Sequence, residues 1–295
     1  MRTIRDILKR SITICLFLAV STAVNATQVD VNGDVKVFEA FHVKVVGEGK
    51  PVFLIPGISS SAEVWEDTVG VLKGHYQLHV FNLAGFAGVP AVSTEKLGTS
   101  VLTYQKNAIR TYIEEQELKD VVIVGHSLGG FLSLWLAAEQ TEQVRAIVNV
   151  DGLPALGALF SSMQNTQDAQ NTPRNFDPVA MVKGMANNTN WHQRILSDMS
   201  KSDQMTSGRA MGELMQLDIR AQLVDVKIPT LTIGAPSQGL PYTSYEHSKH
   251  NYLTQLNNIP LEHRNLSFAK TSRHFVMADE PEWMNQQIKA FLDAL

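Results

Sequence analysis

The sequence is almost free of cysteine. Its single cysteine, Cys15, lies within the first 26 of 295 residues, in a segment that we expect to be a leader. Beyond that segment there is none, which excludes a disulfide, a thiol nucleophile and a thiolate-bound metal in the mature chain. A chain of this length with 44% hydrophobic residues can bury a core that is stable without such cross-links.

Clusters of lysine and arginine are also missing beyond the leader. Charged residues make up 18% of the chain. The leader holds four cations and one anion, so its removal changes the net charge from −4 to −7. An acidic chain without a basic patch argues against nucleic acid as a partner.

The first 26 residues are typical of a secretory signal peptide. "MRTIRDILKR" is basic, "SITICLFLAVSTAV" is apolar, and "VNA" ends in the small residue Ala26. We therefore expect a mature chain of residues 27–295, exported to the periplasm or secreted. The apolar run is shorter than the ~20 residues of a spanning helix, so no stable membrane insertion is expected after cleavage. A retained N-terminal anchor is the alternative.

Beyond the leader, short apolar runs alternate with longer amphipathic ones. Residues 34–47 favour an antiparallel strand pair. Further strands are expected within residues 51–57, 76–88, 121–125, 144–151, 226–235 and 259–269, and helices within 61–74, 103–118, 130–140, 244–256 and 280–295. This alternation predicts an α/β fold with a mostly parallel sheet, helices on both faces and the strand carboxyl ends at one edge.

One long segment interrupts the alternation. Residues from about 154 to 224 contain no strand-like run and hold seven of the ten methionines. Within it, "QNTQDAQNTPRN" is predicted to be a loop and the rest to form short helices. We interpret the segment as an insertion between two strands of a single domain.

A serine between glycines stands at one of the predicted strand-to-helix junctions. In "VVIVGHSLGGFLSLWLAAE", Gly125 and Gly129 flank Ser127 at a spacing of two residues. A serine on such a sharp turn takes a strained positive φ, and its neighbours must be small to avoid a collision. The pattern predicts a nucleophile elbow. An ordinary Gly-Ser turn is the alternative.

With this motif the chain resembles the α/β-hydrolase superfamily, in particular its single-domain serine hydrolases and esterases with a helical cap. The resemblance rests on "PVFLIPGISSSAEVW", "FNLAGFAGVP", "GHSLGG" and "SRHFVMADEPEWMNQQIKAFL". It implies an α/β-hydrolase fold, with an eight-stranded sheet and a helical cap inserted after the sixth strand. It also implies an oxyanion hole made by the backbone N–H groups of Ile58 and Leu128.

The general base of this superfamily is a histidine late in the chain, after the serine and the acid. His274 fits both that order and the resemblance, in a loop between the last strand and the last helix. His192 lies in the insertion and His263 in a probable strand. His247 and His250 form an H-x-x-H pair, which we interpret as solvated helix surface rather than a metal site.

The acid is where the chain departs from its relatives. They usually carry Asp after the strand that matches "IPTLTIG", but "GAPSQGLP" has no carboxylate, and Ser237 or a neighbour takes that place. The best substitute is Asp151, directly after the strand "AIVNV", where some relatives place their acid. Glu246 and Asp225 are the alternatives.

Together these residues predict an exported serine hydrolase that cleaves a small-molecule carboxylic ester through an acyl-enzyme, with no metal or cofactor. An aminopeptidase, amidase or lactonase fits the same triad, and Asp198 or Glu213 could bind a substrate amine. A non-catalytic binding module of the same fold is the weakest alternative, because both Ser127 and His274 are present. The sequence does not specify an oligomeric state.

Overall fold

A computed structural model describes residues 35–163, 177–236 and 244–295 of the chain. The expected leader, the predicted loop at residues 164–175 and Ser237 lie outside the described residues. Among the described residues, every helix is too short or too polar to span a lipid bilayer.

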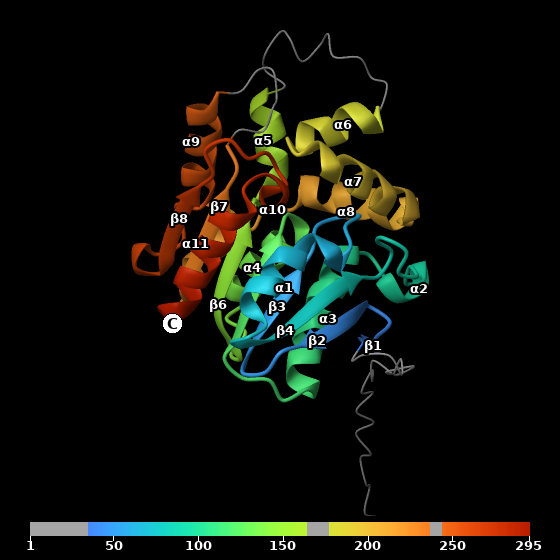
Figure 1. The fold of residues 1–295 in the computed structure, drawn as a ribbon, viewed down its shortest axis with the longest axis vertical. Coiled ribbons are helices and arrows are strands. Elements are labelled where there is room, and N and C mark those ends of the chain that lie inside the picture. Colours follow the sequence, from blue (N-terminus) through green and yellow to red (C-terminus); the bar gives the residue numbers. More distant parts are fainter. Residues whose placement is uncertain (1–34, 164–176, 237–243) are drawn as a thin grey trace, which may run out of the picture.

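The sheet has eight strands, in the order β1-β2-β4-β3-β5-β6-β7-β8 (Figure 1). Its strands are β1 (Val35–Val37), β2 (Phe41–Val46), β3 (Lys50–Ile55), β4 (Tyr76–Leu83), β5 (Val121–His126), β6 (Val144–Val150), β7 (Thr230–Gly234) and β8 (Arg264–Phe268). Strands β3 to β8 pair in parallel, whereas β2 pairs antiparallel with both β1 and β4. The mostly parallel eight-stranded sheet is therefore confirmed, as is the antiparallel pair at its start.

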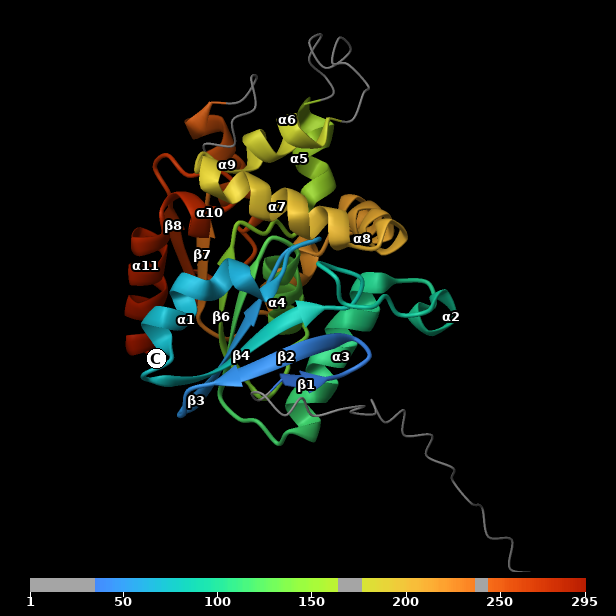
Figure 2. The same cartoon turned by 45° about the vertical axis from the view of Figure 1, so that its right-hand side comes forward.

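Helices cover both faces of this sheet (Figure 2). Alternate side chains of a strand point to opposite faces, and the central strands β5, β6 and β7 are buried at nearly every position because both faces are covered. Phe53 and Ile123 face the core that includes α3 and α4, whereas Val52 and Val124 face the core that includes α1 and α11. These helices are α1 (Glu66–Leu72), α3 (Val101–Glu115), α4 (Leu128–Ala138) and α11 (Pro281–Asp293).

Further helical elements complete the domain. They are η1 (Ala62–Trp65), α2 (Thr94–Leu97), α9 (Tyr245–Gln255), η4 (Leu261–His263) and α10 (Val276–Asp279). The prediction of a strand from residue 259 was wrong at its start, because His263 N–H donates to Pro260 O in a tight turn and β8 begins only at Arg264.

The segment between β6 and β7 contains helices and connecting loops, and no strand among its described residues. It forms α5 (Leu156–Met163), α6 (Pro178–Met185), α7 (Thr189–Lys201), α8 (Gln204–Gln216) and η3 (Arg220–Asp225). In Figures 1 and 2, α6 and α7 lie beyond the edge of the sheet where the parallel strands end. Met181, Met185 and Met199 are partly buried there, whereas the methionines of α8 are exposed.

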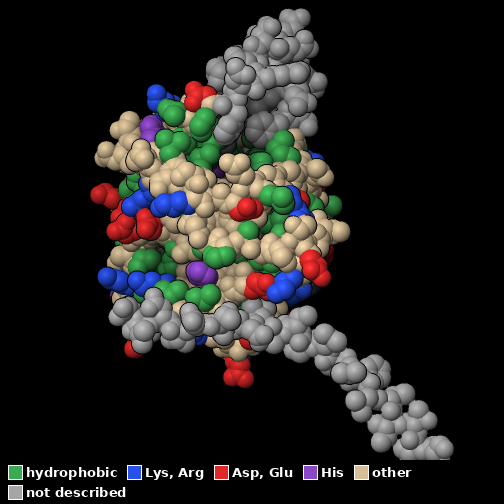
Figure 3. All heavy atoms as spheres, turned by 90° about the vertical axis from the view of Figure 1, so that its right-hand side faces the viewer, with side chains coloured by type: hydrophobic (Ala, Val, Ile, Leu, Met, Phe, Trp, Pro, Cys, Tyr) green, Lys and Arg blue, Asp and Glu red, His purple; other side chains and the backbone are tan. Residues whose placement is uncertain are grey.

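Charge is distributed without strong segregation on the face shown in Figure 3, where acidic and basic side chains are interspersed among apolar ones. Across the described residues, several charged side chains are paired, including Lys96 with Glu39 and Arg194 with Glu66. Exposed pairs of this kind contribute only about 0–1 kcal/mol each. The fold is therefore held mainly by the two apolar cores on either side of the sheet.

Candidate active site

Ser127 lies in the turn that joins β5 to α4 and has φ 53° and ψ −111°. This backbone is strained for a residue with a Cβ. The flanking glycines are required by space: a Cβ at Gly125 would lie 2.1 Å from Gly129 O, and one at Gly129 would lie 2.3 Å from Ile55 O. The turn thus has the strained backbone and the small neighbours expected of a nucleophile elbow, and the Ser127 side chain is only partly buried in it.

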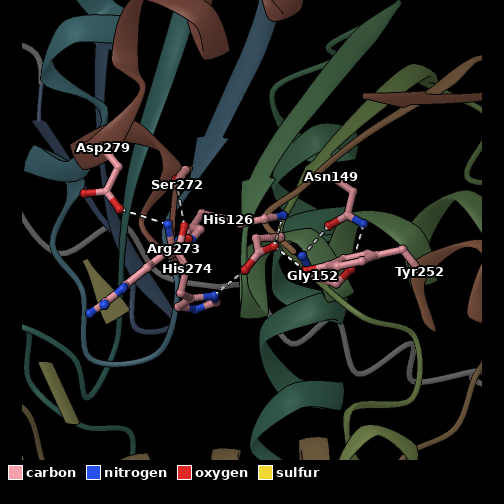
Figure 4. Close-up of polar contacts among 10 residues, drawn as sticks. His126, Asn149, Gly152, Tyr252, Ser272, Arg273, His274 and Asp279 are labelled. Carbon is pink, nitrogen blue, oxygen red and sulfur yellow. Dashed lines mark hydrogen bonds and ion pairs between the residues drawn. The ribbon is translucent and has the colours of Figure 1, made fainter. Parts of the chain in front are cut away.

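Asp151 directly follows β6, with its carboxylate 1% exposed. Its Oδ2 lies 2.6 Å from His274 Nδ1, and its Oδ1 accepts hydrogen bonds from Ala235 N–H at 2.7 Å and from the Tyr252 hydroxyl. Figure 4 shows His274 and Tyr252 approaching this point from different elements. Every oxygen of the buried carboxylate therefore has a donor, as a buried charge requires.

His274 lies in the loop between β8 and α10, and its side chain is 25% exposed. Since an ionised carboxylate only accepts, the contact with Asp151 makes Nδ1 the protonated nitrogen of the neutral ring. Nε2 is then left with a free lone pair. A partly exposed imidazole in this tautomer can accept a proton from a neighbouring hydroxyl.

His126, next to the serine in sequence, has a different environment. It is buried, its Nε2 donates to His274 O at 3.0 Å, and the two imidazole ring centres are 4.6 Å apart. Burial, followed by repulsion from His274, lowers the pKa of His126 well below its usual 6.5. His126 is therefore a neutral group that holds the backbone of the histidine loop beside Ser127.

The loop after β3 passes close to Ser127. A Cβ at Gly57 would lie 3.1 Å from Ser127 Cβ, so the loop that carries Ile58 runs directly beside the serine. Leu128 is the first residue of α4, where a backbone N–H has no acceptor within the helix. Among the described residues, neither Ile58 N–H nor Leu128 N–H donates to a protein acceptor.

The two acids considered for binding a substrate amine are engaged in protein contacts. Asp198 accepts from the N–H and the hydroxyl of Ser61, at 2.9 and 2.7 Å. Glu213 accepts from the Ser100 hydroxyl and from two backbone N–H groups at the start of α3. These carboxylates anchor the loop after β3 and the helix α3 instead.

The other predicted candidates lie away from this cluster. Asp225 and Glu246 are exposed, and neither forms a hydrogen bond or ion pair with His274. His247 and His250 are exposed on α9, and in the described part of the chain no three metal-ligating side chains gather. The structure thus places His274 against Asp151 and against His126, the chain neighbour of Ser127, and places the loop of Gly57 beside the serine. Among the described residues, no hydrogen bond joins the Ser127 hydroxyl to His274.

Tyr252 is the site residue that the sequence reasoning missed. Its helix α9 was predicted, but nothing in the local pattern separates this tyrosine from an ordinary core residue. Only its burial in the fold indicates a role, because a fully buried tyrosine must find a hydrogen-bond partner for its hydroxyl.

Solved hydrolase structures share this fold. A hydrolase from Pseudomonas aeruginosa matches with a TM-score of 0.68 at 15% identity, covering 88% of this chain and 94% of that chain. The enol-lactonase from Burkholderia xenovorans matches with a TM-score of 0.68 at 12% identity, covering 88% and 97%. At these identities the likeness concerns the fold alone.

The sequence comparisons agree with the structural ones. A pimeloyl-(acyl-carrier protein) methyl ester esterase from Vibrio cholerae serotype O1 is 24% identical over 220 residues, which cover 68% of this chain and 81% of that esterase. The family model described as alpha/beta hydrolase fold matches residues 50–272, from the start of β3 to the loop that holds His274. The chain therefore belongs to the alpha/beta hydrolase fold family.

Proposed function

We propose that this protein is an exported serine hydrolase that cleaves a carboxylic ester through an acyl-enzyme. The observation that carries the proposal is the 2.6 Å contact between His274 Nδ1 and the buried Asp151 carboxylate, beside the strained turn of Ser127. Ser127 is the nucleophile, His274 the general base and then acid, and Asp151 the group that orients and stabilises the imidazolium.

The reaction follows from these positions in two steps. Ser127 Oγ attacks the ester carbonyl carbon while His274 Nε2 takes the proton of the serine hydroxyl. The oxyanion that forms accepts hydrogen bonds from the backbone N–H groups of Ile58 and Leu128. The bond to the alkoxy oxygen then breaks, and His274 returns the proton to the leaving alcohol. A water molecule attacks the acyl-enzyme in the same way, which releases the carboxylic acid and restores Ser127.

The contacts of the two candidate acids support an ester rather than an amine-bearing peptide as the substrate. A substrate ammonium group needs a free carboxylate near the serine, but Asp198 and Glu213 are occupied by hydrogen bonds within the protein. The curated relatives are named as methyl ester esterases. A lactone, which is a cyclic ester, would be opened by the same steps.

The helical segment of about residues 154–224 serves as the cap over the site in this proposal. Two contacts with the loop after β3 support this role. Asp198 of α7 accepts a hydrogen bond from Ser61 N–H, and the Ser207 hydroxyl of α8 lies 2.9 Å from the Ser59 hydroxyl. The partly buried methionines of α6 and α7 contribute apolar surface to this segment.

The experiment is a panel of p-nitrophenyl esters of increasing acyl length, a lactone and amino-acyl anilides, measured with the wild type and Ser127→Ala. We expect ester turnover to fall by about 10⁴- to 10⁶-fold in the variant. Near-normal turnover by Ser127→Ala would refute the mechanism. Anilide hydrolysis faster than that of every ester would instead favour an amidase.

A further inference from the structure

The Asp151 carboxylate is held by three different elements. His274 Nδ1 contacts Oδ2 from the loop before α10. Oδ1 accepts two hydrogen bonds, one from the N–H of Ala235 just after β7 and one from the hydroxyl of Tyr252 in α9. Ala235 stands near the place where many relatives carry the acid. In this chain that place supplies a donor to an acid that comes from β6.

Tyr252 is built into the core so that its hydroxyl has little freedom. The residue is 1% exposed, packs with Leu153 and Leu159, and its ring lies 5.8 Å from that of Phe268 at an interplanar angle of 64°. A Cβ at Gly234 would lie 3.3 Å from the Tyr252 ring and 3.0 Å from Phe268. Glycine at this position therefore leaves room for both rings.

We propose that Tyr252 is a positioning residue that orients Asp151 for the proposed triad. A carboxylate can rotate about two side-chain bonds, and donors fixed on Oδ1 leave Oδ2 directed at His274 Nδ1. The hydroxyl also solvates a charge that is removed from water. This inference rests on the proposed function, and it adds a residue that acts through Asp151 and touches no substrate.

The first test is Tyr252→Phe with Tyr112→Phe as its matched control. Tyr112 is equally buried, and its hydroxyl lies 2.8 Å from His79 Nδ1 within a cluster of phenylalanines. We expect Tyr252→Phe to lower kcat about tenfold, the size expected for a hydrogen bond to a charged group, with KM changed less than twofold. Tyr112→Phe should leave both constants within twofold of the wild type. Wild-type kcat in Tyr252→Phe would overturn the proposal.

The second test separates an effect through Asp151 from a general loss of packing. The rate at which a fluorophosphonate labels Ser127 is measured in the wild type, Tyr252→Phe, Asp151→Asn and the double variant. We expect Tyr252→Phe to slow labelling about tenfold relative to the wild type. Added to Asp151→Asn, the same change should slow labelling less than threefold relative to Asp151→Asn alone.

Equal slowing in both backgrounds would mean that Tyr252 acts independently of Asp151 and would overturn the inference. Failure of the wild type to be labelled at Ser127 contradicts the proposed function itself, and with it the role given to Tyr252. Measurements on the same four proteins thus distinguish a failure of the inference from a failure of the proposed function.

Discussion

Two residues of the site have backbone conformations that residues with a Cβ rarely adopt. Ser127 has φ 53° and Asp151 has φ 54°. Each is fixed by backbone hydrogen bonds to a neighbouring strand: Ser127 N–H donates to Val150 O at 2.9 Å, and Asp151 N–H donates to Ile233 O at 2.8 Å. Strain of this kind costs about 1–3 kcal/mol per residue and persists only where the surroundings enforce it.

Replacing Asp151 by Asn should therefore impair catalysis more than folding. An amide of the same shape can donate to His274 Nδ1, which stabilises the wrong tautomer and removes the charge that balances the imidazolium. We expect kcat for a p-nitrophenyl ester to fall by about 10²- to 10⁴-fold. The matched control is Asp225→Asn, an exposed acid that should stay within twofold. A loss below threefold in Asp151→Asn would move the acid elsewhere.

The protonation of buried His79 should affect the stability of the fold. Its Nε2 donates to Gln77 Oε1 and its Nδ1 accepts from the Tyr112 hydroxyl, which requires a neutral ring. Burial, with a smaller contribution from Lys36, lowers the pKa of His79 to about 4 from 6.5. Between these pH values the unfolded chain binds a proton that the folded chain does not, so stability is lost as the pH falls.

We expect this group to remove about 2–3 kcal/mol from the free energy of unfolding between pH 7 and pH 4. Urea unfolding of the wild type and His79→Gln at both pH values measures the difference. The variant should lose less stability on acidification. Equal losses in the two proteins would show that His79 does not titrate in this way.

The sequence could predict those residues of the candidate site that have a local signature. The strained turn of Ser127 was predictable because its glycine neighbours are sterically required, and the contact of Asp151 with His274 because the usual place for the acid has no carboxylate. Tyr252 lies 101 residues from Asp151 along the chain, and no periodicity or spacing links them. Its role depends on how α9 packs against the ends of β6 and β7.

Among the elements, the loop after β3 determines how closely the proposed oxyanion donors approach the serine. A Cβ at Gly57 would lie 3.1 Å from Ser127 Cβ and 3.2 Å from His126 Nδ1. Gly57 has no positive φ, so alanine is compatible with its backbone and the cost is steric. The loop must move by a few tenths of an ångström to accept it.

Gly57→Ala should thus lower kcat/KM about tenfold, since small displacements of catalytic groups are expensive in rate. Gly70→Ala is the matched control, because Gly70 lies in α1 with open space around its Cα. That change should raise the free energy of unfolding by about 0.5–1 kcal/mol and leave kcat/KM unchanged. Equal activity of the two variants would contradict the close approach of the loop.

Elements with strong patterns were predicted well, and the reason is burial. The apolar run of residues 121–124 at the start of β5 is typical of a strand buried on both faces, and the amphipathic run of α11, with Pro281 in its first turn, is typical of a helix. The start of β8 was predicted too early, because residues 259–261 form a short apolar run like that of a strand but lead into a short 3₁₀ segment. Periodicity over so few residues does not distinguish the two.

For the whole molecule, the alternation of strands and helices was enough to predict the layered fold, because parallel strands require crossovers and the crossovers cover both faces. It was not enough to predict which loops meet at the carboxyl edge. That depends on the order in which β3, β5, β6 and β7 pair.

The first 26 residues predict that the protein is exported. The basic, apolar and small-residue parts of residues 1–26 favour removal of the leader after Ala26. Mass spectrometry of protein recovered from the periplasm or medium should find Thr27 at the N-terminus. An intact Met1 in that fraction would contradict cleavage and favour a retained anchor.

Covalent labelling of the folded protein with a fluorophosphonate, followed by peptide mass spectrometry, tests the role of Ser127 most directly. We expect one adduct, on Ser127, that is absent from Ser127→Ala and forms at least 10²-fold more slowly in His274→Ala. An unlabelled wild type, or an adduct on another serine that survives Ser127→Ala, would contradict that role.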